Sequence, residues 1–297
     1  GNATAGVVYA LDHKSGVIQW VRPVDGEIPS SPVLYGEMLY IATKQGTLYA
    51  LHSDTGNVTW SFQPQPGSEI VAAPAVDSYG NIYVTSSYYA PWTFYVGSDV
   101  EGQHAVYKIS PGGNKIWRFL FAYVLHSTPV VDEAQGVVYV GGHDKRVLTL
   151  DMTTGEPRGC RETGTQISSS PALLPDGSLV YAGEDGYLYK CSPGCAELLW
   201  KVSITSEISG AALAEASDAA APAADASLAP YFMSSPIVLG GGTTVFAVNF
   251  EGTVMSVDAA TGNKLYVAEM SSGTERVKVA ASPAVGRDGS IYITDYE

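Results

Sequence analysis

Short runs of apolar residues recur along the chain, and turns containing glycine separate them. Residues 7–20 read VVYALDHKSGVIQW, and residues 47–60 read TLYALHSDTGNVTW, which is nearly the same stretch. The runs are short, rich in Val, Ile, Leu and Tyr, and bounded by turn residues, which favours β-strands. No stretch keeps a helical period, so the pattern predicts an all-β fold with almost no helix.

Two spacings recur through the sequence. In the first, a residue in an LYAL-like run is followed ten or eleven residues later by Trp or by its replacement. The six pairs are Tyr9 and Trp20, Tyr49 and Trp60, Tyr107 and Trp117, Leu148 and Gly159, Tyr189 and Trp200, and Met255 and Tyr266. In the second, a proline is followed eight to ten residues later by an aromatic residue. These prolines are Pro32, Pro74, Pro129, Pro171, Pro236 and Pro283.

Each repeat therefore predicts four strands, A to D. Strand A follows the proline, B carries the first aromatic residue, C is the LYAL-like run, and D ends at the Trp. Four-stranded units at intervals of roughly 40 to 65 residues are typical of a β-propeller. We expect a single domain over residues 1–297 with six repeats. Residues 1–20 and 280–297 would together form a terminal blade closed by both chain ends. A ring of seven or eight blades is the alternative if the chain is a fragment.

The turn between strands C and D carries the most specific pattern. ALDHKSGVIQW is close to A-x-D-x-x-T-G-x-x-x-W, which recurs in ALHSDTGNVTW, TLDMTTGEPRG and SVDAATGNKLY. This motif resembles the repeat of the PQQ-like, or quinoprotein-like, β-propellers, and the resemblance covers the whole chain. We expect the recurring indoles to be structural wedges between blades, each with its N–H on a backbone partner. They are Trp20, Trp60, Trp117 and Trp200.

The resemblance implies two different functions. Some members are periplasmic quinoprotein dehydrogenases that hold PQQ and calcium, whereas the BamB-like outer-membrane assembly lipoproteins are scaffolds without a cofactor. The dehydrogenases carry two adjacent cysteines, but Cys160, Cys191 and Cys195 are not adjacent. We therefore expect a non-catalytic binding or scaffolding propeller, and assign no catalytic, cofactor or metal residue. The alternatives are a divergent PQQ- and calcium-dependent oxidoreductase and a structural unit of an extracellular assembly.

Three segments interrupt the repeats. Residues 86–104 stand where other repeats have a short B–C turn, and residues 207–231 form an insertion rich in Ala, Ser and Asp, expected to be a loop or tether. Residues 118–126, RFLFAYVLH, are apolar where the equivalent links are polar. Because strands alternate in direction, all three segments are expected on one face. We predict that this face binds a protein or glycan partner through its aromatic side chains, unless the long loop packs on itself. The predicted binding residues are Tyr88, Tyr89, Trp92, Phe94, Tyr95, Phe119, Phe121 and Tyr123.

The composition of the chain limits the kinds of partner that it can bind. The net charge of −14 opposes binding to nucleic acid and to anionic membranes, and no apolar run is long enough to span a bilayer. The histidines show no metal-binding spacing. Three of them, His104, His126 and His143, are predicted on the face that carries the three irregular segments. The chain starts without Met, as expected of a processed or partial product.

Two features favour a secreted or otherwise extracytoplasmic location, whether periplasm, secretory lumen or extracellular space. Asn2 and Asn57 lie in N-x-[ST] sequons, which predict glycosylation. Asn57 falls in a C–D turn, which is expected on the face opposite the three irregular segments. Cys191 and Cys195 in CSPGC are close enough for a disulfide across a tight hairpin, or they are two free small hydrophobic residues. The pairing of Cys160 is left open.

Overall fold

The computed structural model describes residues 6–88, 104–204, 232–272 and 275–295. Within these ranges every regular element is a β-strand except one short 3-10 turn, η1 (Pro193–Cys195), which confirms the prediction of an all-β chain. The described residues include no helix with the length and apolar character needed to cross a membrane.

The chain divides into two compact units. Unit 1 is Gly1–Val131 with Thr154–Glu156, and unit 2 is Asp132–Thr153 with Pro157–Glu297. The interpretation of residues 1–297 as one domain stays a prediction.

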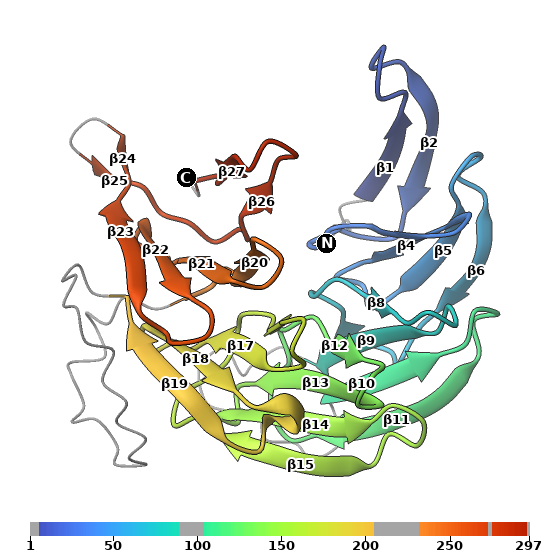
Figure 1. The fold of residues 1–297 in the computed structure, drawn as a ribbon. Coiled ribbons are helices and arrows are strands. Elements are labelled where there is room, and N and C mark those ends of the chain that lie inside the picture. Colours follow the sequence, from blue (N-terminus) through green and yellow to red (C-terminus); the bar gives the residue numbers. More distant parts are fainter. Residues whose placement is uncertain (1–5, 89–103, 205–231, 273–274, 296–297) are drawn as a thin grey trace. The chain divides into compact units, whose positions relative to one another are not determined.

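Antiparallel sheets follow one another along the chain (Figure 1). The first pairs β1 (Gly6–Leu11) with β2 (Ile18–Val24). The second runs β3 (Val33–Tyr35), β4 (Met38–Ala42), β5 (Leu48–His52) and β6 (Val58–Phe62). The third places β9 (Ile82–Tyr88) next to β10 (His104–Ile109) and β10 next to β11 (Lys115–Phe121); both β7 (Ser68–Glu69) and β8 (Ala75–Val76) pair with β9.

Three further sheets repeat the four-strand order. They are β12 (Val130–Asp132), β13 (Val137–Gly142), β14 (Arg146–Asp151) and β15 (Pro157–Glu162); β16 (Ala172–Leu173), β17 (Leu179–Ala182), β18 (Tyr187–Cys191) and β19 (Leu198–Ser203); and β20 (Ile237–Leu239), β21 (Thr244–Val248), β22 (Thr253–Asp258) and β23 (Lys264–Glu269). Two-stranded sheets join β24 (Ser271–Ser272) to β25 (Glu275–Arg276) and β26 (Ala284–Val285) to β27 (Ile291–Tyr292). Because β1–β2 and β26–β27 are separate sheets, the shared terminal blade and the number of blades stay predictions.

The first aromatic residue of the repeat lies in the core in four of the sheets. Tyr40 and Tyr83 in unit 1, and Tyr139 and Tyr181 in unit 2, are at most 1% exposed. Three of these rings lie next to another aromatic ring, with centroids 5.1–6.0 Å apart: Tyr40 and Trp60, Tyr83 and Trp117, and Tyr181 and Tyr189. Full burial of one large apolar side chain stabilises a fold by about 1.5–3 kcal/mol. The proline-to-aromatic spacing in the sequence therefore marks the buried strand of these four sheets, whereas Tyr292 in β27 is exposed.

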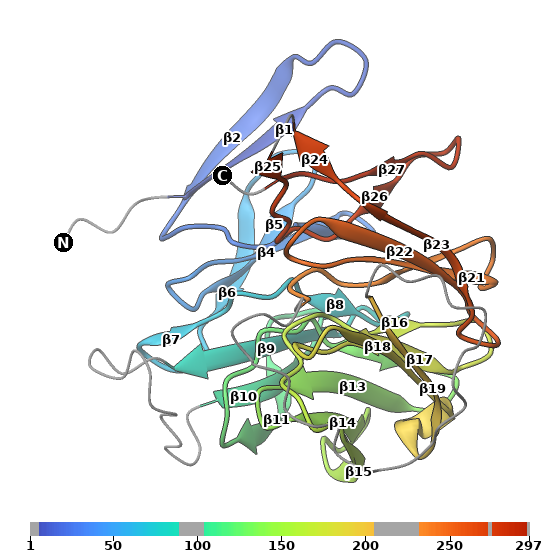
Figure 2. The same ribbon diagram turned by 90° about the vertical axis from the view of Figure 1, so that its left-hand side faces the viewer.

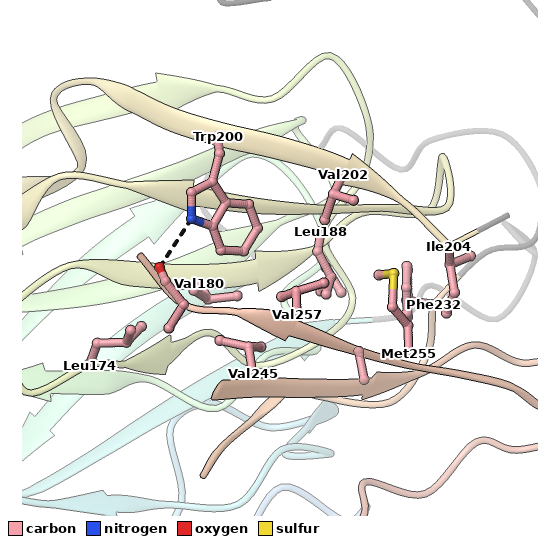
Figure 3. Packing of buried hydrophobic residues seen from close by; sticks show 13 residues of the cluster. Leu174, Val180, Leu188, Trp200, Val202, Ile204, Phe232, Val245, Met255 and Val257 are labelled. Atoms are coloured by element: carbon pink, nitrogen blue, oxygen red, sulfur yellow. Dashed lines mark hydrogen bonds between the residues drawn. The ribbon is translucent and has the colours of Figure 1, made fainter. Parts of the chain in front are cut away.

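The recurring indoles join each sheet to the next one along the chain. The Nε1 of Trp20 donates to the carbonyl of Ser53 (2.7 Å), and that of Trp60 donates to the carbonyl of Pro111 (2.8 Å). In unit 2, the Nε1 of Trp200 donates to the carbonyl of Ala259 (3.1 Å; Figure 3). In each case the acceptor lies in the C–D turn of the following sheet.

The glycine of the same turn forms the flat surface under each indole. It has a φ between +65° and +83° in all four turns, which favours glycine over any other residue. A Cβ placed on it would lie 2.5–2.9 Å from an atom of the indole, closer than real contacts allow. The pairs are Gly56 with Trp20, Gly113 with Trp60, Gly155 with Trp117, and Gly262 with Trp200.

The outer strands extend further than the sequence predicts. Instead of ending at the Trp, strand D continues two to four residues beyond it, to Val24, Phe62, Phe121 and Ser203 in β2, β6, β11 and β19. The physical reason is pairing: these residues still align opposite strand C, as Phe121 does opposite His104. Much of the apolar link at residues 118–126 is therefore strand.

The contact between the β12–β15 sheet and the β16–β19 sheet has no indole and is made by other groups. Gly159 in β15 stands where the other repeats have Trp, and the next C–D turn contains η1. The Gly194 N–H of that turn donates to the hydroxyl of Tyr139 (2.9 Å), and the Thr149 hydroxyl donates to the Gly194 carbonyl (3.3 Å). A disulfide joins Cys191 and Cys195 across the turn, with Cα atoms 4.9 Å apart. Hydrogen bonds from the turn to Tyr139 and from Thr149 to the turn thus take the place of the indole contact, and the disulfide closes the turn itself.

Candidate partner-binding site

The described ends of the 86–104 segment are held side by side. Strands β9 and β10 pair as far as Ser86 and Ala105. Beyond that pair, the Tyr88 N–H donates to Nδ1 of His104 (3.3 Å), whose side chain is fully buried. The residues on either side of positions 89–103 are therefore held next to each other by the sheet. We call these flanking residues, 85–88 and 104–105, the base of the segment. Four of the predicted binding residues, Tyr89, Trp92, Phe94 and Tyr95, lie outside the described residues.

This base is also tied to the link that precedes it. The short strand β7 pairs with the end of β9, Ser68 opposite Tyr88 and Glu69 opposite Ser87, and Figure 2 shows β7 beside that end of β9. The half-buried Tyr88 ring lies over Gly67, where an added Cβ would come within 3.0 Å of the ring. Tyr88 is thus packed in place by its own blade.

The link that follows is tied to the base by hydrogen bonds. The Ser87 hydroxyl accepts from the Leu125 N–H (2.9 Å) and donates to the Leu125 carbonyl (3.1 Å). Thr85 adds a hydrogen bond to the carbonyl of Ser127 (3.2 Å). The structure therefore brings the base of residues 86–104 and the link 118–126 together. We call this region, residues 67–69, 85–88, 104–105 and 119–127, the junction.

The aromatic residues of the link differ in exposure. Tyr123 is 41% exposed, Phe119 is half-buried, and Phe121 is only 6% exposed. The rings of Phe119 and Phe121 pack edge to face, with centroids 5.5 Å apart. The expectation that Phe121 faces a partner is therefore wrong for the described structure, because β11 continues past Trp117. Phe121 lies four residues after Trp117, so both point to the same, buried side of the strand.

The other predicted residues are spread over the chain. Asn57 is exposed in its C–D turn, and its Oδ1 accepts from Arg22 (3.0 Å); its glycosylation stays a prediction. Asn2, residues 207–231 and the Cys160 side chain lie outside what the structure describes. The two residues that flank the insertion are fixed: Ile204 and Phe232 are buried near Met255 in the same apolar cluster (Figure 3).

Sequence reasoning missed a polar contact between two sheets of unit 2. Nε2 of His143, in the β13–β14 turn, lies 3.0 Å from the hydroxyl of Ser168. That hydroxyl donates to Glu184 in the β17–β18 turn (2.5 Å). All three side chains are partly exposed. The contact joins three different turns, so no spacing within one repeat reveals it.

This contact gives a testable pH dependence. Burial lowers the pKa of His143 below its ordinary value of 6.5, and the Glu184 carboxylate offsets part of that effect. Just below pH 6.5 the unfolded chain therefore binds more protons at this residue, so its contribution to stability falls as the pH drops through that window. Thermal melts between pH 7.5 and 5 should show a smaller loss of Tm for His143→Gln than for the wild-type chain. An identical pH slope in both would contradict this assignment.

A quinone and calcium site does not fit the residues described. No group of three His, Cys, Asp or Glu side chains is placed to hold a metal ion within the described ranges. Cys191 and Cys195 are bonded to each other at a turn rather than adjacent in sequence. We therefore derive no chemical step through such a group.

Comparison with known proteins gives the relationship. The family model described as outer membrane protein assembly factor BamB matches residues 3–88 and 68–297. The chain is 28% identical over 170 residues to BamB of Yersinia pestis (54% of this chain, 40% of that protein) and 22% identical over 252 residues to BamB of Burkholderia pseudomallei (83% and 57%). The matches thus span about half the length of these relatives.

Two solved structures share the architecture. The crystal structure of BamB from Moraxella catarrhalis aligns with a TM-score of 0.66 at 16% identity (98% of this chain, 79% of that one). A europium-containing methanol dehydrogenase aligns with a TM-score of 0.61 at 14% identity (97% and 78%). At this identity the likeness establishes only the fold, a β-propeller, as the sequence predicts. Since the family model covers most of the sequence, the chain belongs to the family of the outer membrane protein assembly factor BamB.

Proposed function

We propose that this chain is an extracytoplasmic, non-catalytic scaffold that binds another protein through the junction. Family membership supports a scaffold, because the relatives named above are assembly factors of the outer membrane. The observation that carries the proposal is the pair of hydrogen bonds between Ser87 and Leu125. They hold residues 85–88, which precede the aromatic part of the 86–104 segment, beside the link that carries the exposed Tyr123. Exposed apolar surface on a fixed base is typical of a partner-binding site.

A protein partner is favoured over a glycan partner. Aromatic rings suit both, but the relatives carry names of protein-assembly factors, and none of the described contacts specifies a sugar. The acidic charge of the chain fits a partner other than nucleic acid. No observation in the structure favours the oxidoreductase alternative specifically.

Photo-cross-linking tests this proposal. A benzophenone amino acid is placed at Tyr123 or, as the matched control, at Tyr79. Tyr79 belongs to the same sheet but lies in the A–B turn at the opposite end of the strands, and it is 75% exposed. In the extracytoplasmic fraction of the source cells, we expect a discrete cross-linked protein from position 123 and none from position 79.

A substitution measures the contribution of the tyrosine. Tyr123→Ser should reduce the amount of the cross-linked or co-purified protein at least fivefold, while Tyr79→Ser leaves it unchanged. Because Tyr123 is largely exposed, its loss should change the Tm little. Equal capture by the two variants, or equal cross-linking from the two positions, would reject the junction as the binding site.

A further inference from the structure

Strand β11 differs from the other outer strands in its outward side chains. One residue before and three residues after the Trp, the four Trp-bearing repeats have Gln19 and Pro23, Thr59 and Gln63, Ile116 and Leu120, and Leu199 and Ser203. Only β11 has an aliphatic residue at both positions. Ile116 is 48% exposed and Leu120 is 43% exposed. β11 thus presents an apolar row that leads to Tyr123 at the junction.

The outer edge of β11 has no strand partner among the described residues. It is the last strand of its sheet and pairs only with β10. Its seven residues contain no proline. Its one register shift skips Ile116, because Lys108 lies opposite Trp117 and Ile109 lies opposite Lys115. Proline, bulges, very short strands and charged side chains are the usual devices that prevent a further strand from adding to an edge. From Trp117 to Phe121 this edge carries no proline and no bulge, and its one charged side chain is Arg118.

The charge around β11 is opposite to that of the whole chain. Residues 102–131 contain no Asp or Glu, although the chain has 30 of them. Lys115 and Arg118 are exposed on this strand. Within the described part of the chain, neither makes an ion pair. β11 is therefore a basic and apolar strand on an acidic molecule.

We propose that β11 is a strand-addition site for an extended protein segment that carries aliphatic and acidic side chains on the same face. The main chain of the segment would pair with the free edge of β11. Its aliphatic side chains would pack on Ile116 and Leu120, and its carboxylates would lie near Lys115 and Arg118. This inference deepens the proposed function and rests on it, because it names the kind of partner segment that binds beside the junction.

A second copy of this chain fits the strand less well than an acidic segment. In the register that pairs two antiparallel β11 strands along their whole length, Arg118 of one copy would lie opposite Arg118 of the other. Like charges opposite each other destabilise a strand pair. An acidic segment instead gains attraction at the same positions, so charge complementarity selects a foreign, acidic strand.

The test uses three fluorescent ten-residue peptides and the whole chain. The first, called the Glu–Val peptide, has Val and Glu in turn at every second position, with Thr between them, so that Val and Glu share one face. The second has Lys in place of Glu. The third is the Glu–Val peptide with alternate backbone nitrogens methylated, which removes its hydrogen-bond donors on one edge. Fluorescence anisotropy should give a Kd for the Glu–Val peptide at least tenfold lower than for the other two. Hydrogen exchange should show new protection of β11 amides when the Glu–Val peptide binds.

Protein variants locate the binding. Leu120→Glu and Ile116→Glu should each raise the Kd of the Glu–Val peptide at least tenfold. Leu199→Glu is the matched control, since Leu199 is 49% exposed on the outer strand β19, and it should leave binding unchanged. Equal binding of the methylated peptide, or equal effects of Leu120→Glu and Leu199→Glu, would overturn the proposal. So would a peptide-free dimer that protects β11 from exchange. If these tests fail while Tyr123-dependent cross-linking persists, the scaffold function stands and only the strand-addition site is rejected.

Discussion

Replacing Trp200 by alanine should lower the free energy of unfolding of unit 2 by about 3–5 kcal/mol, the usual range for a large buried aromatic. Trp200 is 7% exposed and packs in an apolar cluster of unit 2, among side chains that include Leu188 and Val257 (Figure 3). Its Nε1–H satisfies the Ala259 carbonyl, and its ring covers Gly262. The substitution removes buried area, a hydrogen bond and the contact between two sheets together.

Urea unfolding followed by fluorescence and circular dichroism measures this effect, with two controls. Leu199→Ala, on the same strand but 49% exposed, should cost less than about 1 kcal/mol. Trp200→Phe keeps much of the apolar area and removes only the indole N–H, while the Ala259 carbonyl still accepts from Nζ of Lys190 (2.9 Å), so its effect should fall between the other two. If Trp200→Ala costs no more than Leu199→Ala, the indole is not the structural wedge described above.

The repeat could be predicted because its constraints are local. The eleven-residue spacing from Tyr189 to Trp200 lies within one hairpin, and such hairpins recur along the chain. In the sequence, the glycine of the C–D turn is recognisable only as part of the repeated A-x-D-x-x-T-G-x-x-x-W pattern. Its role, to lie flat under the indole of the preceding sheet, requires a contact between residues 62 positions apart in the case of Trp200 and Gly262. No single repeat contains that information.

The candidate site could be predicted only in outline. The sequence placed residues 86–104 and 118–126 on neighbouring parts of one face, and the hydrogen bonds between Ser87 and Leu125 join them. The burial of Phe121 was missed because strand D was expected to end at Trp117. A period of two counted onward from Trp117 would have placed Phe119 and Phe121 on its buried side. The same count gives Ile116 and Leu120 as outward residues.

Contacts between turns of different sheets are beyond this kind of reasoning. The His143, Ser168 and Glu184 contact depends on how two successive sheets of unit 2 pack. Polar residues in turns are common for local reasons, since Asp, Ser and Gly favour the turn itself. A sequence therefore shows that such residues are present, but not which of them meet.

Asp77→Ala should lower the free energy of unfolding of unit 1 by about 3–5 kcal/mol, as expected when one partner of a buried ion pair is removed. The Asp77 side chain is fully buried and lies 3.8 Å from the Nζ of Lys108, which is itself 9% exposed. Its Oδ1 accepts from the N–H groups of Tyr79 (3.0 Å) and Asn81 (2.8 Å), and its Oδ2 accepts from the Tyr83 hydroxyl (3.0 Å). Alanine removes all of these acceptors and leaves a buried ammonium group without its carboxylate.

A double-mutant cycle separates the contribution of the Asp77–Lys108 ion pair from that of the hydrogen bonds that Asp77 accepts within its turn. Lys108→Met replaces the ammonium group by an apolar side chain of similar length, so Asp77→Ala should be less damaging in the Lys108→Met background, by at least 1 kcal/mol. Asp77→Asn keeps an acceptor for the turn N–H groups but not the charge, and it should cost less than Asp77→Ala. Urea midpoints of the four cycle members give the coupling. If the two single losses simply add, Asp77 acts only as a turn residue, and the buried pair contributes no stability of its own.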